Sequence, residues 1–122
     1  MERILVVDDE IEICEILKEF LSKKGYDVDT ATDGKAAINK VKEIRPHIVL
    51  LDIKMPGMDG IQTLKEIKKI DPAVGVIMIT AVGDEELAKR AFEMGAYDYI
   101  LKPVDFDYLE RVLLVSIIQF LG

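Results

Sequence analysis

The sequence predicts an α/β fold in which a parallel β-sheet carries helices on both faces. Five short segments typical of strands alternate strictly with five segments of helical periodicity, and the connections between them are short. Three of the strand segments are continuous runs of Val, Ile, Leu and Met, as expected for strands that are covered on both sides. Because crossovers between parallel strands are right-handed, the 122 residues are expected to form one doubly wound domain.

The first unit is a strand over residues 4–7 followed by a helix that ends at Gly25. We expect Asp9 to cap this helix, with Glu12 at the third helical position. Its inward face is predicted by helical spacing: Ile13, Cys14, Leu17, Phe20 and Leu21. Cys14 is the one cysteine, so an internal disulfide is excluded and a core position is expected.

The second unit begins with an edge strand, because residues 26–31 alternate between apolar and polar side chains. A helix opens at Asp33 and ends before Pro46. Its inner face is expected to carry four apolar residues: Ala37, Ile38, Val41 and Ile44. His47 lies in the turn after this helix, and we expect it at the surface.

The third strand and its loop, residues 48–60, organise the rest of the chain. An apolar run ends at Asp52, which is therefore placed at the carboxyl end of a buried strand. Three residues then stop the strand and free the backbone to turn: Pro56, Gly57 and Gly60. Asp59 is the expected N-cap of a helix over residues 60–70, with Gln62 as its capping-box partner.

The last two units repeat this pattern. We expect a fourth strand over residues 76–79, a helix over 83–94 with Gly95 as its C-cap, and a fifth strand over 97–101. Asp105 is the expected N-cap of the final helix.

The final helix has apolar side chains on two sides. One stripe can face the sheet: Leu109, Leu113, Ile117 and Phe120. The opposite side is apolar as well: Leu114, Val115, Ile118 and Leu121. Since a surface helix normally has a polar outer face, we expect a homodimer or a neighbouring segment to cover it. The alternative is that the additional apolar residues are simply tolerated.

The composition limits the function. A formal charge of −7 argues against direct binding of nucleic acid and favours a cation or a partner with a basic patch. No apolar run reaches membrane-spanning length, and the first residues lead straight into a strand, so a cytoplasmic protein without a membrane segment is expected. The single cysteine fits a reducing compartment.

Polar residues follow four of the five strands, at positions that parallel strands bring to one edge of the sheet. They are Asp8 and Asp9, Asp52, Thr80, and Lys102. Two carboxylates about 4 Å apart repel by about 4 kcal/mol at an effective dielectric constant near 20, so three together favour a cation such as Mg²⁺. A threonine hydroxyl and a lysine can hold phosphoryl oxygens, and an aspartate can accept the phosphoryl group as an acyl phosphate.

With these residues, the chain resembles the receiver domains of two-component response regulators from residue 4 to about residue 113. The resemblance is carried by four segments: Asp8-Asp9, Asp52 with residues 55–60, Thr80-Ala81, and Tyr99 through Lys102-Pro103. It implies a flavodoxin-like fold of five βα units with strand order 2-1-3-4-5. It also implies that residues 1–122 form one receiver domain, either alone or as the N-terminal part of a longer response regulator.

The resemblance implies a role for each carboxylate. Asp52 would accept a phosphoryl group from a sensor histidine kinase or a phosphotransfer protein. Asp9 would bind Mg²⁺ or Mn²⁺ directly, Asp8 would bind it mainly through water, and the backbone carbonyl of Lys54 would be a further ligand. The chain would catalyse only its own phosphorylation and dephosphorylation.

The resemblance also implies how the signal leaves the site. Thr80, the amide of Ala81 and Lys102 would contact the phosphoryl oxygens, and the peptide bond before Pro103 would be cis. Thr80 and Tyr99 would form a switch that changes the surface of the fourth helix, fifth strand and fifth helix. Two further positions, Lys54 and Val82, would influence the lifetime of the acyl phosphate.

Two other functions stay open at this point. An aspartyl-phosphate phosphatase of the haloacid-dehalogenase kind also uses Asp, Thr, Lys and Mg²⁺, but its nucleophile follows the first strand in an Asp-x-Asp pattern, and here that strand ends in Asp8-Asp9-Glu10. A pseudo-receiver would be a binding module that acts without phosphorylation, and such modules usually lack a site residue. The sequence identifies neither the kinase nor the output.

Overall fold

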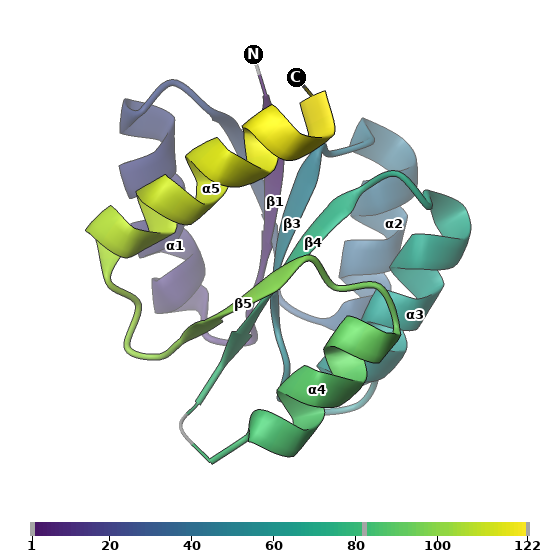
Figure 1. Ribbon diagram of the computed structural model, residues 1–122. Coiled ribbons are helices and arrows are strands. Elements are labelled where there is room, and N and C mark those ends of the chain that lie inside the picture. Colours follow the sequence, from purple (N-terminus) through teal and green to yellow (C-terminus); the bar gives the residue numbers. More distant parts are fainter. Residues whose placement is uncertain (1, 82, 122) are drawn as a thin grey trace.

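The computed structural model describes residues 2–81 and 83–121, with the side chains of residues 120 and 121 left out (Figure 1). Strands and helices alternate through these residues: β1 (Arg3–Val7), α1 (Ile11–Lys23), β2 (Asp27–Ala31), α2 (Gly34–Ile44), β3 (Ile48–Asp52), α3 (Gly60–Ile70), β4 (Gly75–Thr80), α4 (Glu85–Glu93), β5 (Asp98–Leu101) and α5 (Phe106–Leu121). All strand pairs are parallel, and the order is β2-β1-β3-β4-β5. The predicted fold class and strand order are confirmed.

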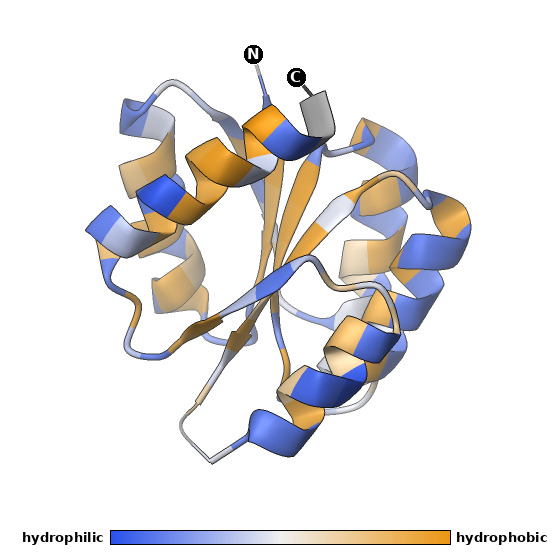
Figure 2. Ribbon diagram, in the orientation of Figure 1, coloured by the Kyte–Doolittle hydropathy of each residue, from blue (hydrophilic) through white to orange (hydrophobic). Residues whose placement is uncertain are grey.

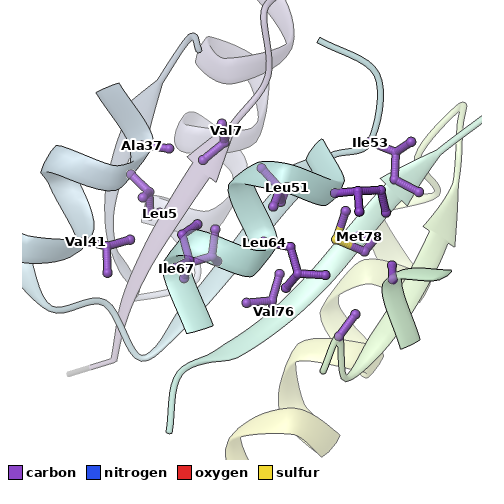
Figure 3. Packing of buried hydrophobic residues seen from close by; sticks show 14 of the residues in the cluster. Leu5, Val7, Ala37, Val41, Leu51, Ile53, Leu64, Ile67, Val76 and Met78 are labelled. Atoms are coloured by element: carbon purple, nitrogen blue, oxygen red, sulfur yellow. The ribbon is translucent and has the colours of Figure 1, made fainter. Parts of the chain in front are cut away.

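The side chains of β1 divide between two cores, one on each face of the sheet. Ile4 and Val6 pack with α1 and α5, whereas Leu5 and Val7 pack with α2, α3 and α4. Figure 3 shows the second of these cores from close by. Because each fully buried aliphatic side chain contributes about 2 kcal/mol, both faces of the central strands help to hold the sheet. In Figure 2 the central strands are mostly hydrophobic, whereas the helices carry both hydrophilic and hydrophobic residues.

The pairing register brings the strand ends to one edge of the sheet. Val7 of β1 pairs with Leu51 of β3, so the next residues on these two strands, Asp8 and Asp52, are neighbours at that edge. On the other side, Thr80 ends β4 beside Leu101, the residue before Lys102.

Aspartate caps define the start of most helices. Three aspartates accept a hydrogen bond from a backbone N–H three residues further on: Asp33 from Ala36 at 2.7 Å, Asp59 from Gln62 at 2.9 Å, and Asp105 from Tyr108 at 3.1 Å. These predicted caps are confirmed. Asp84 precedes α4, but its side chain makes no capping hydrogen bond.

The prediction that Asp9 caps the first helix was wrong. The helix begins at Ile11, and its N-cap residue is Glu10. The Asp8 carboxylate instead accepts a hydrogen bond from the backbone N–H of Glu10 at 2.9 Å. This turn delays the helix and leaves the exposed Asp9 side chain at the edge of the sheet.

His47 is half-buried rather than at the surface. Its Nδ1 accepts a hydrogen bond from the backbone N–H of Arg3 at 2.9 Å, and its own backbone N–H donates to the Arg3 carbonyl. The Arg3 guanidinium in turn donates to the carbonyls of Ile44 and Arg45 at the end of α2. Cys14 is buried, as predicted, and its thiol donates to the Asp8 carbonyl.

Helix α5 has the second apolar side that the sequence predicts. Leu109 and Leu113 are buried against the sheet, while Leu114, Val115 and Ile118 are 50%, 56% and 72% exposed. The side chains of Phe120 and Leu121 lie outside the described residues, and a homodimer through this face stays a prediction. None of the helices in the described ranges is long and apolar enough to cross a membrane.

Candidate functional site

A hollow of about 250 Å³ opens at the carboxyl edge of the sheet. The last residues of β3 and β4 and the loops that follow β1, β3, β4 and β5 line it: Asp9, Glu10, Asp52, Ile53, Lys54, Thr80, Ala81, Asp84 and Lys102. Most of the residues that the sequence predicts for the site are therefore brought together.

Three carboxylates meet at this hollow. One oxygen each of Asp8, Asp9 and Asp52 lies within 4.8 Å of the others. Asp8 and Asp52 are only 1% and 5% exposed, whereas Asp9 is open to solvent. Such a group of close carboxylates is strongly repulsive unless a positive charge lies beside it.

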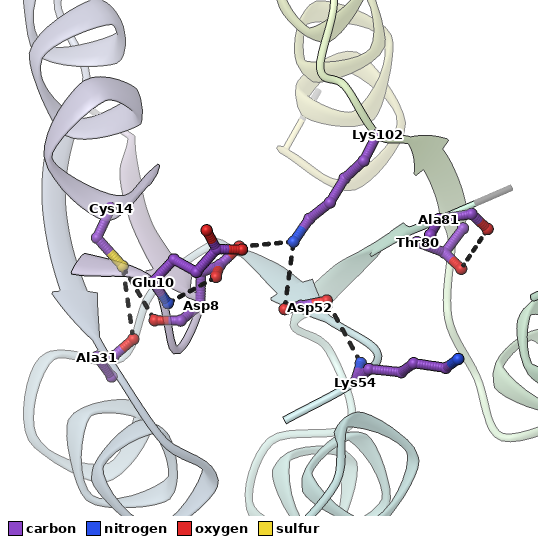
Figure 4. Close-up of polar contacts among 9 residues, drawn as sticks. All are labelled: Asp8, Glu10, Cys14, Ala31, Asp52, Lys54, Thr80, Ala81 and Lys102. Atoms are coloured by element: carbon purple, nitrogen blue, oxygen red, sulfur yellow. Dashed lines mark hydrogen bonds and ion pairs between the residues drawn. The ribbon is translucent and has the colours of Figure 1, made fainter. Parts of the chain in front are cut away.

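Lys102 supplies one such charge. Its Nζ lies 3.2 Å from Oδ2 of Asp8 and 3.3 Å from Oδ2 of Asp52, so the ammonium bridges the ends of β1 and β3 (Figure 4). The backbone N–H of Lys102 donates to the Thr80 carbonyl at 2.7 Å. The peptide bond between Lys102 and Pro103 is cis, as the resemblance implies.

The site changes the acid–base properties of Asp52. Burial and the neighbouring charge of Asp8 raise the pKa of Asp52 to about 6, although Lys102 partly opposes this shift. Burial alone would lower the pKa of Lys102, but the charges of Asp52 and Asp8 outweigh it and raise that pKa above its usual value. Lys102 therefore stays protonated, and Asp52 is mostly ionised at neutral pH.

Without a bound cation, ionised Asp52 should destabilise the fold. Its pKa of about 6 lies above the usual 3.8, so the folded state binds more protons and stability falls as pH rises through this interval. The shift corresponds to roughly 2–3 kcal/mol. In EDTA, Asp52→Asn should be more stable than wild type by that amount at about pH 7 and no more stable at about pH 4, where urea unfolding measures both. Equal stabilities at pH 7 would contradict this assignment.

The residues predicted to sense the phosphoryl group lie on the β4–β5 side of the hollow. Thr80 is buried, and its hydroxyl donates to the Ala81 carbonyl at 3.4 Å (Figure 4). Ala81 is exposed. Tyr99 is half-buried on β5, outside the lining of the hollow, and packs edge-on against Phe92 of α4 with ring centroids 5.6 Å apart. Val82 lies outside the described residues.

The carboxylates fit a divalent cation. Oδ2 of Asp8 is buried and lacks a hydrogen-bond partner among the described residues, although the Lys102 ammonium lies beside it. Hard carboxylate oxygens of this kind are ligands for Mg²⁺ or Mn²⁺. Asp8, Asp9 and Asp52 could thus hold a metal ion. The Lys54 backbone N–H donates to Oδ1 of Asp52 at 3.3 Å, and its carbonyl stays a predicted ligand.

Sequence reasoning missed three residues of the hollow, the apolar Ile53 and the acidic Glu10 and Asp84. Asp84 was interpreted only as the start of a helix, yet its Oδ1 lies 3.0 Å from Nζ of Lys54. The available signal was the acidic residue itself, four positions after Thr80, but its partner is 30 residues away in the sequence.

A profile of the response regulator receiver domain family matches residues 4–114. The chain belongs to this family. The receiver domain is 47% identical to the transcriptional regulatory protein ZraR of Escherichia coli K12 over 110 residues. The match covers 90% of this chain and 25% of ZraR. It is 44% identical over 103 residues to the chemotaxis protein CheY of Thermotoga maritima, covering 84% and 86% of the two chains.

Solved structures agree with this assignment. A response regulator receiver domain protein from Clostridium thermocellum superposes with a TM-score of 0.93 at 35% identity, over 98% of this chain and 96% of that one. The receiver domain of NtrX from Brucella abortus superposes with a TM-score of 0.88 at 40% identity, over 93% of this chain and 96% of that one. The receiver domain thus spans about a quarter of ZraR but most of CheY. The haloacid-dehalogenase alternative is set aside by the family match.

Proposed function

We propose that this receiver domain accepts a phosphoryl group on Asp52 and uses the modification to control an output partner. The donor would be a phosphohistidine on a sensor histidine kinase or a phosphotransfer protein. The observation that supports the proposal best is the meeting of Asp8, Asp9 and Asp52 with the ammonium of Lys102 at one edge of the sheet.

The transfer needs an ionised, positioned carboxylate. An Oδ atom of Asp52 attacks phosphorus, the bond from phosphorus to the imidazole nitrogen of the donor breaks, and the imidazole leaves with the electron pair. Lys102 holds Asp52 in place and offsets negative charge as it develops on the phosphoryl oxygens. A Mg²⁺ ion held by Asp8, Asp9 and Asp52 would neutralise further charge during the transfer.

The signal would leave the site through Thr80 and Tyr99. We propose that the Thr80 hydroxyl and the Ala81 amide contact the phosphoryl oxygens and that the Tyr99 ring then moves inward. Tyr99 already contacts Phe92 of α4, so a movement of the Tyr99 ring would change the packing of that helix. The affected surface comprises α4, β5 and α5, on which Leu101 and Tyr108 are exposed.

The relatives suggest two forms of output: a further domain on the same chain, or a separate partner protein. ZraR, by its name a transcriptional regulator, extends far beyond the matched region, whereas the match covers most of CheY. We propose a cytoplasmic site of action, because the single Cys14 needs no oxidising compartment, and we propose that the domain turns over no external substrate.

Acetyl phosphate, a small phosphoryl donor, tests the proposal without knowledge of the kinase. With Mg²⁺ present, intact-mass measurement should show the gain of one phosphoryl group per chain, and excess EDTA should prevent it because the close carboxylates then lack their cation. A wild-type chain that gains no phosphoryl group and does not bind beryllofluoride would instead be a pseudo-receiver.

A further inference from the structure

Asp84 differs from the other aspartates that precede helices. Asp33, Asp59 and Asp105 each cap the helix that follows, but the Asp84 side chain makes no hydrogen bond to α4. Its backbone has φ −102° and ψ 28°, whereas Asp33 and Asp59 have ψ of 170° and 172°. An extended backbone is what allows an N-cap side chain to reach the first turn. The first turn of α4 therefore lacks the cap that its sequence offers.

The Asp84 carboxylate instead forms an ion pair with Lys54. Nζ of Lys54 lies 3.0 Å from Oδ1 of Asp84, and both residues line the hollow that contains Asp52. The Lys54 backbone N–H donates to Oδ1 of Asp52, while its side chain runs toward the side of the site where Thr80 and Ala81 lie (Figure 4). The Lys54 side chain is 70% exposed and that of Asp84 only 12%, so Lys54 is the partner that is free to move.

We propose that Lys54 and Asp84 form a latch that links the charge on Asp52 to the first turn of α4. The proposal rests on phosphorylation of Asp52. Phosphorylation replaces the single negative charge of ionised Asp52 with a phosphoryl group that carries up to two, so the site gains one negative charge near the backbone of Lys54, and this charge attracts the flexible ammonium of Lys54 away from Asp84. Asp84 then adopts the extended backbone and accepts a hydrogen bond from the N–H of Leu87, as the other three aspartates do with their helices.

The two arrangements are close in free energy, which is what a switch requires. A partly exposed ion pair changes an equilibrium by at most about fivefold, and an aspartate N-cap changes it by about fivefold as well. One carboxylate cannot serve both partners at once. A nearby dianion is therefore sufficient to move Asp84 from Lys54 to the helix.

The unmodified protein tests the latch alone. Lys54→Met removes the ammonium and keeps the backbone, so the freed Asp84 should slow amide hydrogen exchange at Leu87 about fivefold. Lys54→Met combined with Asp84→Ala should not slow it, and neither should Lys89→Met, which removes an exposed lysine of α4 itself. Unchanged exchange in Lys54→Met, or equal slowing in the double variant, would overturn the latch.

Beryllofluoride with Mg²⁺, a mimic of the phosphoryl group, tests its link to Asp52. Wild type should show the same slowing at Leu87, and Asp84→Ala should not. If beryllofluoride binds, as seen by fluorine NMR, but exchange at Leu87 stays unchanged or slows equally in Asp84→Ala, the link is overturned while the proposed function stands. If beryllofluoride does not bind, the proposed function and the link both fail, and the Lys54→Met result still decides the latch.

Discussion

Replacing Asp52 with asparagine should abolish phosphoryl transfer from acetyl phosphate. The amide has nearly the shape of the carboxylate but lacks the anionic oxygen that attacks phosphorus, so the initial rate should fall by a factor of at least about 100. The variant keeps a polar group beside Lys102 and Asp8 and should fold normally. Intact-mass measurement over time, in the presence of Mg²⁺, gives the rate.

Asp29→Asn is the matched control. Asp29 lies on the edge strand β2 and pairs with Lys40 at 2.8 Å, away from the hollow. This variant loses the same charge and should react at the wild-type rate. Phosphoryl incorporation that persists in Asp52→Asn would show that another residue is the acceptor, and the roles assigned to Asp8 and Lys102 would then need revision.

Gly60→Ala should cost the fold about 3 kcal/mol. A Cβ atom on Gly60 would lie 2.6 Å from both Cα and the carbonyl oxygen of Ile53 and against the carbonyl oxygen of Asp52. This backbone cannot yield easily, because the Ile53 N–H donates to Ile79 and the Ile53 carbonyl accepts from Gly60 itself. The cost belongs at the upper end of the range for overpacking. Urea unfolding with Gln62→Ala as the control, an exposed change on the same helix, measures it.

The same substitution should also slow phosphorylation, since the displaced atoms include the backbone of Asp52. Gln62→Ala should change stability by no more than about 0.5 kcal/mol and leave the rate unaltered. A Gly60→Ala protein as stable as wild type would mean that the loop after β3 adjusts freely. Asp52 would then owe its position to Lys102 and the strand ladder alone.

Most element boundaries were readable because their signals are local. Continuous apolar runs indicate β1, β3 and β4, and an aspartate three residues before a free N–H indicates the start of a helix. The same aspartate can, however, find a better partner elsewhere. Asp84 forms an ion pair with Lys54, and Asp8 rather than Asp9 accepts the hydrogen bond from the backbone N–H of Glu10 before α1. No local sequence pattern distinguishes these outcomes from a helix cap.

The convergence of the site followed from topology. Carboxyl ends of parallel strands share an edge, so the polar residues after β1, β3, β4 and β5 were expected to meet, but placing β1 beside β3 required the family resemblance. Contacts at the opposite edge could not be foreseen. His47 and Arg3 are 44 residues apart, and no pattern in either segment predicts their hydrogen bond.

The two outermost strands also restrict how copies of this domain can associate. β2 is five residues long and carries Asp27 and Asp29, and β5 is four residues long and begins with Asp98. Short, acidic borders repel the matching border of another molecule, so a continuous intermolecular ribbon of strands is disfavoured. A dimer is then expected to form through helical surfaces, and high protein concentrations should not convert the folded domain into fibrous aggregates.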